Sequence, residues 1–99
     1  MTRTHLSPND EEKWCHTIKS NERKLRYIGV GVRNPFFPRL GPFEIKIGGQ
    51  IIEMMIDAYG RMKPRFIIWS TIKLLDEMEV GDRIIIVKRR DRVYEMKKG

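Results

Sequence analysis

The stretch from residue 43 to residue 56 constrains the fold more than any other part of the chain. Its sequence is FEIKIGGQIIEMMI, in which apolar residues alternate with charged ones and two glycines stand in the middle. A Gly-Gly pair suits the positive φ angles of a two-residue hairpin turn. The pattern predicts an antiparallel hairpin in which Ile45 faces Ile52 and Phe43 faces Met54. One face of this hairpin is then wholly apolar and consists of Phe43, Ile45, Ile47, Ile52, Met54 and Ile56.

The opposite face of the same hairpin carries two like charges. The register places Glu44 directly across from Glu53, and such a pair costs some free energy unless a cation lies nearby. Lys46 is the nearest cation along the strand. We expect this face to be exposed to solvent.

The N-terminal part of the sequence contains helix and strand signals. Residues 1–6 are expected to be flexible. Ser7-Pro8-Asn9-Asp10 carries a capping residue, a proline for the first helical position and an acidic residue three positions after the cap. These signals predict a helix that runs to about Ser20. A strand is expected over 25–33, and a rigid loop with three prolines over 34–42.

The C-terminal part of the sequence predicts a strand, a helix and a second hairpin. A short strand is expected over 66–69. Ser70 is expected to cap a helix over 71–78 that buries Ile72, Leu75 and Met78, and Gly81 ends this segment. The second hairpin then has strands over 83–88 and 92–97, with Val87 opposite Tyr94 and Ile85 opposite Met96. The elements together predict one α+β domain over residues 1–99, a small, mostly antiparallel, partly open β-barrel with two short helices.

Composition narrows the class of function. A chain of 99 residues has room for one core. No apolar run approaches the roughly 20 residues that span a bilayer, and no signal peptide is evident, so we expect a cytoplasmic protein without a membrane partner. Charged residues make up 33% of the chain and only three asparagines and one glutamine occur. This balance is typical of hyperthermophiles and indicates an archaeal or viral source.

Catalysis and metal binding have little support in the sequence. Cys15 is the single cysteine and is adjacent to His16, which is not a ligand spacing. Asp57, Asp82 and Glu53 are the carboxylates that a metal-dependent nuclease would need, but both aspartates are typical turn residues. We therefore expect no enzyme, no catalytic or metal-binding residue, no cofactor and no small-molecule substrate.

Positive charge points instead to a polyanionic partner. The formal net charge is +7, which favours nucleic acid through long-range attraction. Basic residues gather at two expected turns: Arg61, Lys63 and Arg65 at one, and Lys88, Arg89, Arg90 and Arg92 at the other. If both turns share one end of the barrel, they form a cationic ridge that binds phosphates. The alternative is that each turn is merely solvated.

The proline-rich loop offers a second candidate contact. Phe36 and Phe37 stand beside Arg39, and exposed aromatic rings next to arginine can stack on nucleobases or dock a protein partner. The alternative is that both rings fold back into the core.

The segment from about residue 50 to residue 97 resembles a known family. Asp57-x-x-Gly60-Arg61, then Ile68-Trp69, then Val80-Gly81-Asp82 before a terminal hairpin, is similar to the AbrB and SpoVT swapped-hairpin DNA-binding domains. Trp69 stands where that family has proline, and about four extra residues lie around 63–65. The resemblance implies a dimeric regulator whose Arg61 lies on the DNA-facing side. The Gly-Asp turn is also found in the RNA-linked PUA and ASCH barrels.

These observations favour one function and leave two alternatives. The favoured function is a homodimeric nucleic-acid-binding protein, a transcriptional regulator or architectural protein that binds duplex DNA. The first alternative is a structural or interaction protein, in which charge serves solubility and heat stability. The second is an RNA-binding barrel of PUA or ASCH type.

Overall fold

A computed structural model describes residues 12–99 of the chain. The expected flexible residues 1–6 and the start of the expected N-terminal helix lie outside this range. The strands are β1 (Lys13–Thr17), β2 (Ile28–Gly29), β3 (Phe43–Ile47), β4 (Gln50–Ile56), β5 (Arg61–Pro64), β6 (Arg83–Arg90) and β7 (Val93–Lys98). The helices are α1 (Ser20–Leu25), the 3₁₀ turn η1 (Trp69–Thr71) and α2 (Lys73–Asp76).

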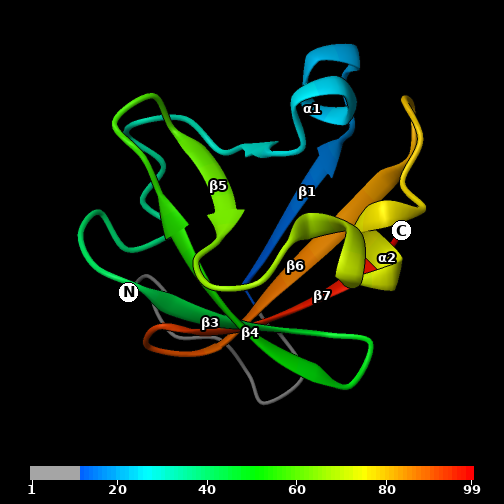
Figure 1. Cartoon of the computed structure of the whole chain (residues 1–99). Coiled ribbons are helices and arrows are strands. Elements are labelled where there is room, and N and C mark those ends of the chain that lie inside the picture. The colour runs from blue at the N-terminus through cyan, green and yellow to red at the C-terminus, as the bar shows by residue number, and fades with distance from the viewer. Residues whose placement is uncertain (1–11) are drawn as a thin grey trace, which may run out of the picture.

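All of these strands belong to one curled sheet with the order β1-β6-β7-β3-β4-β5-β2. Neighbouring strands run antiparallel except β3 and β7, which run parallel. The expected small α+β fold with a barrel-like sheet and few short helices is therefore confirmed (Figure 1). The expected mostly antiparallel barrel is corrected to a mixed sheet that curls without closing. The parallel pair arises because the C-terminal hairpin returns to lie beside β3.

The central hairpin has the predicted structure. In β3 and β4, Ile45 pairs with Ile52 and Phe43 pairs with Met54. Gly48 and Gly49 both have positive φ angles, at 58° and 83°. The inner residues of the hairpin are buried, apart from the half-buried Ile56, because they face the concave side of the sheet.

The predicted N-terminal helix is wrong within the described residues. Lys13–Thr17 forms an edge strand that pairs with β6, with Trp14 opposite Ile86. The ladder of backbone pairs with β6 and the contact of the Trp14 ring with Phe37 outweigh local helix propensity, which is a weak determinant. The helix α1 begins only at Ser20 and ends where Arg26 adopts a left-handed conformation with φ of 60°. The helix α1 includes Leu25, the first residue of the predicted strand 25–33, and only Ile28–Gly29 of that range forms a strand, β2.

A buried carboxylate joins α1 to the two strands around it. Glu22 is 3% exposed and accepts hydrogen bonds from His16 Nε2 on β1 at 2.6 Å and from the Gly29 N–H on β2 at 2.5 Å. Its other oxygen accepts the Lys19 N–H at 2.8 Å. Since buried polar groups need partners, these bonds fix how α1 crosses the end of the sheet.

The predicted strand 66–69 is also wrong. The chain enters β5 immediately after Gly60, so the paired residues are Arg61–Pro64, and residues 65–67 form a bend. Ile72, Leu75 and Met78 are buried as expected, although α2 is shorter than the predicted helix. Ser70 makes no capping bond to it, because residues 69–71 already form the 3₁₀ turn η1.

The C-terminal hairpin differs from the prediction by one residue of register. Tyr94 lies opposite Lys88 and Met96 lies opposite Ile86, because an irregularity between Lys88 and Arg90 adds one residue to β6. The turn is at Asp91-Arg92. A bulge of this kind cannot be seen in the alternation of side chains, since it shifts the whole partner strand.

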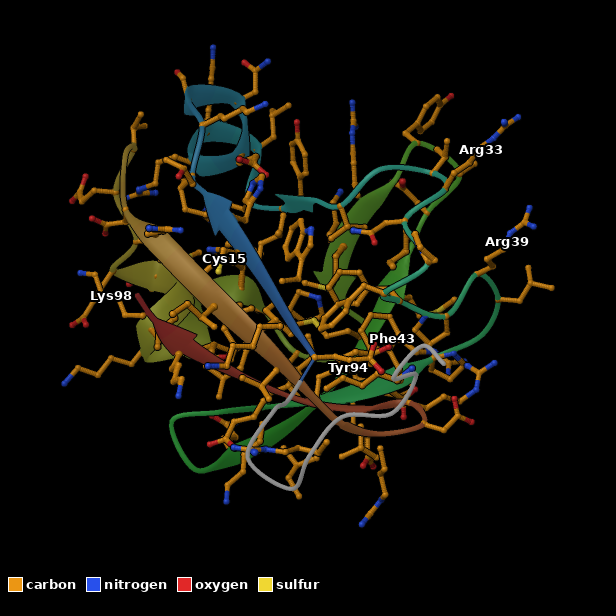
Figure 2. All side chains as sticks on the ribbon, turned by 180° about the vertical axis from the view of Figure 1, so that it is seen from behind. Cys15, Arg33, Arg39, Phe43, Tyr94 and Lys98 are labelled. Atoms are coloured by element: carbon orange, nitrogen blue, oxygen red, sulfur yellow. The ribbon has the colours of Figure 1, made fainter. Side chains whose placement is uncertain are left out.

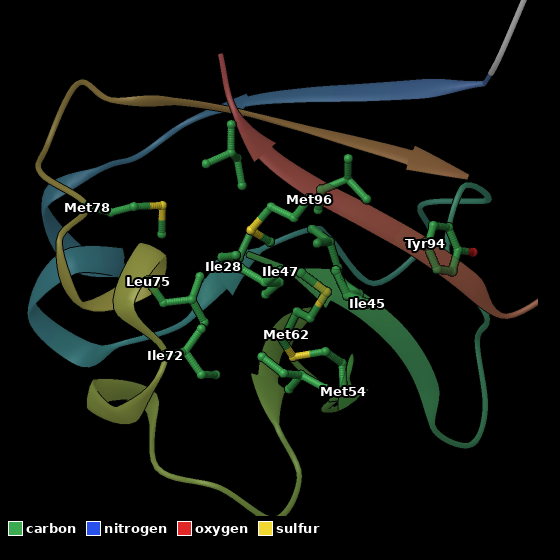
Figure 3. Packing of buried hydrophobic residues seen from close by; sticks show 14 of the residues in the cluster. Ile28, Ile45, Ile47, Met54, Met62, Ile72, Leu75, Met78, Tyr94 and Met96 are labelled. Atoms are coloured by element: carbon green, nitrogen blue, oxygen red, sulfur yellow. The ribbon is translucent and has the colours of Figure 1, made fainter. Parts of the chain in front are cut away.

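The core fills the concave side of the sheet. Figure 3 shows Ile72, Leu75 and Met78 pointing from the α2 segment toward strand residues such as Ile28 and Met96. An aromatic group extends this core toward the loop 34–42 and includes Phe37, Phe43 and Tyr94. Within residues 12–99, no helix is long and apolar enough to cross a membrane.

Candidate nucleic-acid interface

The two basic turns of the sequence lie at the same end of the sheet. The turn 57–60 follows the end of β4, which lies beside the start of β3. The turn 91–92 precedes the start of β7, which runs parallel to β3 with Val93 opposite Glu44. The starts of β3 and β7 therefore separate the two turns.

The loop 30–42 connects these two turns. Its beginning is fixed by Gly60, whose carbonyl accepts the N–H groups of Val30 at 2.9 Å and Gly31 at 3.2 Å. Its end is fixed by Arg92, whose Nη1 donates to the carbonyls of Leu40 at 2.9 Å and Pro42 at 3.1 Å. The loop thus forms part of the same surface as both turns.

This loop adds two arginines to the surface. Arg33 and Arg39 are exposed, and Figure 2 shows both side chains projecting from the same side of the molecule. We use the name basic end for the arginines that the loop and the two turns bring to this end of the sheet. The basic end consists of Arg33, Arg39, Arg61, Arg90 and Arg92.

Two of the other predicted members of the ridge, Arg65 and Arg89, are engaged in ion pairs. Lys63 lies within β5 and is close enough to the turn for its charge to lower the pKa of Asp57. Arg65 follows β5 and forms an ion pair of 2.6 Å with Glu53. This arginine, rather than Lys46, is therefore the cation that compensates the Glu44–Glu53 pair. Lys88 and Arg89 lie at the end of β6 that leads into the turn 91–92, and Arg89 forms an ion pair of 2.7 Å with Glu95. Two of the seven residues expected in the ridge are thus engaged in ion pairs, and the ridge itself stays a prediction.

Arg61 lies close to two tyrosines that the sequence analysis did not select. Its guanidinium carbon is 5.0 Å from the ring centre of Tyr27 and 5.4 Å from that of Tyr59. Both distances are within the range of cation–π attraction. The sequence could have indicated Tyr59 as a candidate site residue, because it is an aromatic residue in an expected turn close to an arginine. Tyr27 had no such signal, because it reaches the site from a distant segment.

Asp57 holds the turn that carries Tyr59. Its Oδ1 accepts the N–H groups of Tyr59 at 2.9 Å and Arg61 at 3.0 Å. Desolvation raises the pKa of Asp57, but these backbone hydrogen bonds and the charges of Arg61 and Lys63 outweigh it, so that the pKa lies below its usual value. The carboxylate therefore stays ionised at neutral pH and stabilises the turn.

Phe36 and Phe37 do not offer free rings for stacking. Phe37 is 3% exposed and packs in the core, and Phe36 is half-buried against Phe37 and Tyr94. The Tyr94 hydroxyl donates to the Phe36 carbonyl at 2.5 Å. The alternative that these rings fold into the core is therefore the one observed, and the proposed base-stacking role is corrected for Phe37. Arg39 remains exposed at the surface of the loop.

The carboxylates considered for catalysis have separate structural partners. Asp57 holds its turn, Glu53 pairs with Arg65, and Asp82 accepts the Glu79 N–H and lies 3.4 Å from Lys98 Nζ. Among residues 12–99, no cluster of histidine, cysteine and carboxylate side chains is arranged to hold a metal ion.

Comparison with known proteins identifies no relative: no family model matches the sequence, and no significant match occurs among curated proteins or solved structures. The resemblance to the AbrB and SpoVT domains therefore stays a prediction.

Proposed function

We propose that this protein binds nucleic acid through the basic end, with duplex DNA as the favoured ligand, and acts as a small regulator or architectural protein. The observation that supports this proposal is the position of the two basic turns at one end of the sheet, joined by a loop that adds Arg33 and Arg39. A resemblance to AbrB-type regulators would be consistent with it.

The basic end offers guanidinium groups for phosphate contacts. Arg33, Arg39 and Arg90 are exposed and make no side-chain hydrogen bond or ion pair with any residue in 12–99. A guanidinium presents a planar set of donors that matches two phosphate oxygens. Arg92 is exposed and uses Nη1 on the loop carbonyls, and its Nη2 and Nε donors take no part in these two bonds.

The spacing of the basic end favours a duplex. The turns on β4–β5 and β6–β7 are separated by three strand spacings, which corresponds to roughly 14 Å along the sheet at about 4.8 Å per strand, and to less in a straight line because the sheet curls. This is comparable with the major groove of B-DNA, which is about 12 Å wide. Contacts to phosphates on both sides of a groove are therefore within reach, and β-hairpins are known to enter grooves.

A salt-titrated binding assay tests this proposal. Fluorescently labelled duplex DNA, single-stranded DNA and structured RNA are titrated with protein at several salt concentrations. If about five phosphates are contacted, the slope of log affinity against log salt is about −4 to −5 for duplex DNA. No binding to any of the three at about 0.1 M salt would overturn the proposal, and preference for RNA would favour the PUA or ASCH alternative.

A pair of charge-matched variants locates the surface. Arg39→Ala with Arg90→Ala removes two charges from the basic end, and we expect a large loss of affinity and a salt slope shallower by about 2. Lys24→Ala with Lys73→Ala removes the same net charge from exposed positions elsewhere and should change affinity little. Equal losses for both variants would mean that binding depends on net charge alone.

A second candidate function is a protein-interaction role with self-association. The observation that favours it is a set of exposed apolar side chains at β4 and the bend after β5. Ile51 is 67% exposed, Phe66 is 74% exposed and Ile68 is 67% exposed. The Arg65 N–H donates to the Glu53 carbonyl, which places the start of the bend after β5 beside β4, and contiguous exposed apolar patches mark protein interfaces.

A further inference from the structure

We propose that Tyr59, Arg61 and Tyr27 form a stacking site for an unpaired nucleobase at the edge of the basic end. This inference rests on the proposed function and specifies it, because it names a structural feature of the nucleic acid, a single-stranded overhang next to a duplex. The site is distinct from the aromatic pair Phe36-Phe37, whose rings pack against the core.

Tyr59 is exposed but held in a defined position. Tyr59 is 77% exposed, and its backbone N–H donates to Asp57 Oδ1. The next residue, Gly60, is buried and bonded to the loop 30–42 through its carbonyl. A fixed aromatic ring in solvent gains contact area on binding without a large loss of backbone entropy.

The Arg61 guanidinium packs against the Tyr59 ring. Its guanidinium lies 5.4 Å from the Tyr59 ring centre and 5.0 Å from the Tyr27 ring centre, so the cation is shared by two rings. Tyr59 still keeps most of its surface in solvent. Stacking on an aromatic ring is available to every base, because every base has a π-face.

Phosphate contacts for the same nucleotide lie on the neighbouring loop. The N–H groups of Val30 and Gly31 donate to the Gly60 carbonyl in the turn that carries Tyr59. Arg33 is two residues after Gly31 in the chain, so it starts from a point beside this turn. A hollow of about 560 Å³ opens between this loop and the turn, and Val32, Asn34, Arg39, Asp57 and Ala58 are among the residues that line it. This size is within the usual range of small-ligand sites. The hollow has room for the nucleotide that follows the stacked base.

The consequence is a preference for ends that carry unpaired bases. The protein should bind a duplex with a short overhang more tightly than the same duplex with blunt ends. Stacking of one base on an aromatic ring corresponds to roughly tenfold or more in affinity.

The test uses one duplex with and without an overhang that contains 2-aminopurine, a base whose fluorescence falls when it stacks. We expect the wild-type protein to prefer the overhang roughly tenfold and to quench its fluorescence. Tyr59→Ala and Tyr59→Leu should bind the blunt duplex as the wild type does, but lose the preference and the quenching. Tyr59→Phe should keep both, because the ring is retained.

The outcomes separate this site from the function on which it rests. No binding of the wild-type protein to either duplex would overturn both proposals. Equal binding to both duplexes, or a Tyr59→Ala variant that keeps the preference and the quenching, would overturn the stacking site alone. Because Tyr59 is exposed, the variants should retain the thermal unfolding midpoint of the wild type, which circular dichroism measures.

Discussion

Gly60 has the closest approach to another backbone segment among the glycines of residues 12–99. Its φ angle is +78°, and a Cβ atom there would lie 2.5 Å from the carbonyl carbon of Gly31. Both the conformation and the close approach therefore require glycine. The contact holds the loop 30–42 against the turn that carries Tyr59.

We expect Gly60→Ala to lower the free energy of unfolding by about 2–4 kcal/mol, from backbone strain and the forced separation of the loop. Gly48→Ala is the matched control, because Gly48 also has a positive φ of +58° but no atom near the position of a Cβ. That control should cost about 1–2 kcal/mol. Urea unfolding of the two variants measures the difference, and equal losses would mean that the contact with Gly31 contributes nothing.

Tyr94 makes stability sensitive to alkaline pH. Burial, followed by the charges of Asp91 and Glu12, raises the pKa of its hydroxyl from 10.0 to about 12. Since the pKa is higher in the folded state, the contribution to stability is complete below pH 10.0 and is lost as the pH rises toward about 12. We expect Tyr94→Phe to flatten this decline.

The same variant loses the hydrogen bond to the Phe36 carbonyl, which should cost about 1 kcal/mol at neutral pH. Thermal unfolding midpoints between pH 7 and 12 measure both effects. Tyr59→Phe serves as the control, because that side chain is exposed. A Tyr94→Phe variant as sensitive to alkali as the wild type would assign the decline to other groups.

At the scale of elements, Glu22 connects β1, α1 and β2 through one buried carboxylate. A glutamine at this position has one acceptor oxygen and an amide group that faces existing donors. We expect Glu22→Gln to lower the free energy of unfolding by about 1–3 kcal/mol. Glu77→Gln, at an exposed position, should be nearly neutral. Denaturant unfolding compares the two, and a neutral Glu22→Gln would show that the three bonds are replaceable.

The elements that the sequence predicts correctly are those whose signals are local. The hairpin 43–56 carries its turn and its alternation within one stretch, so its register follows directly. The edge strand β1 could not be predicted in this way, because its partner β6 lies about 70 residues further along the chain. The bulge in β6 has no signal in the pattern, and it shifted the predicted register by one residue.

The candidate site likewise has features that are visible in the sequence and features that depend on tertiary contacts. The basic character of the turns at Arg61 and Arg90 is visible in the sequence, and pairing with β3 explains why the turns share one end. The pairing of Arg65 with Glu53 and the approach of Tyr27 to Arg61 depend on tertiary contacts. Charge clusters thus indicate a candidate surface, whereas only packing shows which of its side chains are already paired.

At the scale of the whole molecule, we expect the protein to form a homodimer, and the exposed apolar residues indicate which surface forms the interface. We expect light scattering to give a mass of twice 11.8 kDa for the wild type. Ile51→Ser with Ile68→Ser should shift the mass toward the monomer, because both side chains are exposed in the single chain. Leu40→Ser, at a residue of the loop 30–42 that is 81% exposed, should have no effect. A wild-type monomer at high concentration would rule out the homodimer.

The position of β7 has a consequence for synthesis of the chain. This strand is the sole link in the sheet order between the pair β1-β6 and the group β3-β4-β5-β2. Its residues are translated after all the other strands, and contacts that join distant segments form slowly. Until residues 93–98 have been synthesised, the edge of β3 that pairs with β7 has no partner strand, and an unpaired strand edge favours aggregation during folding.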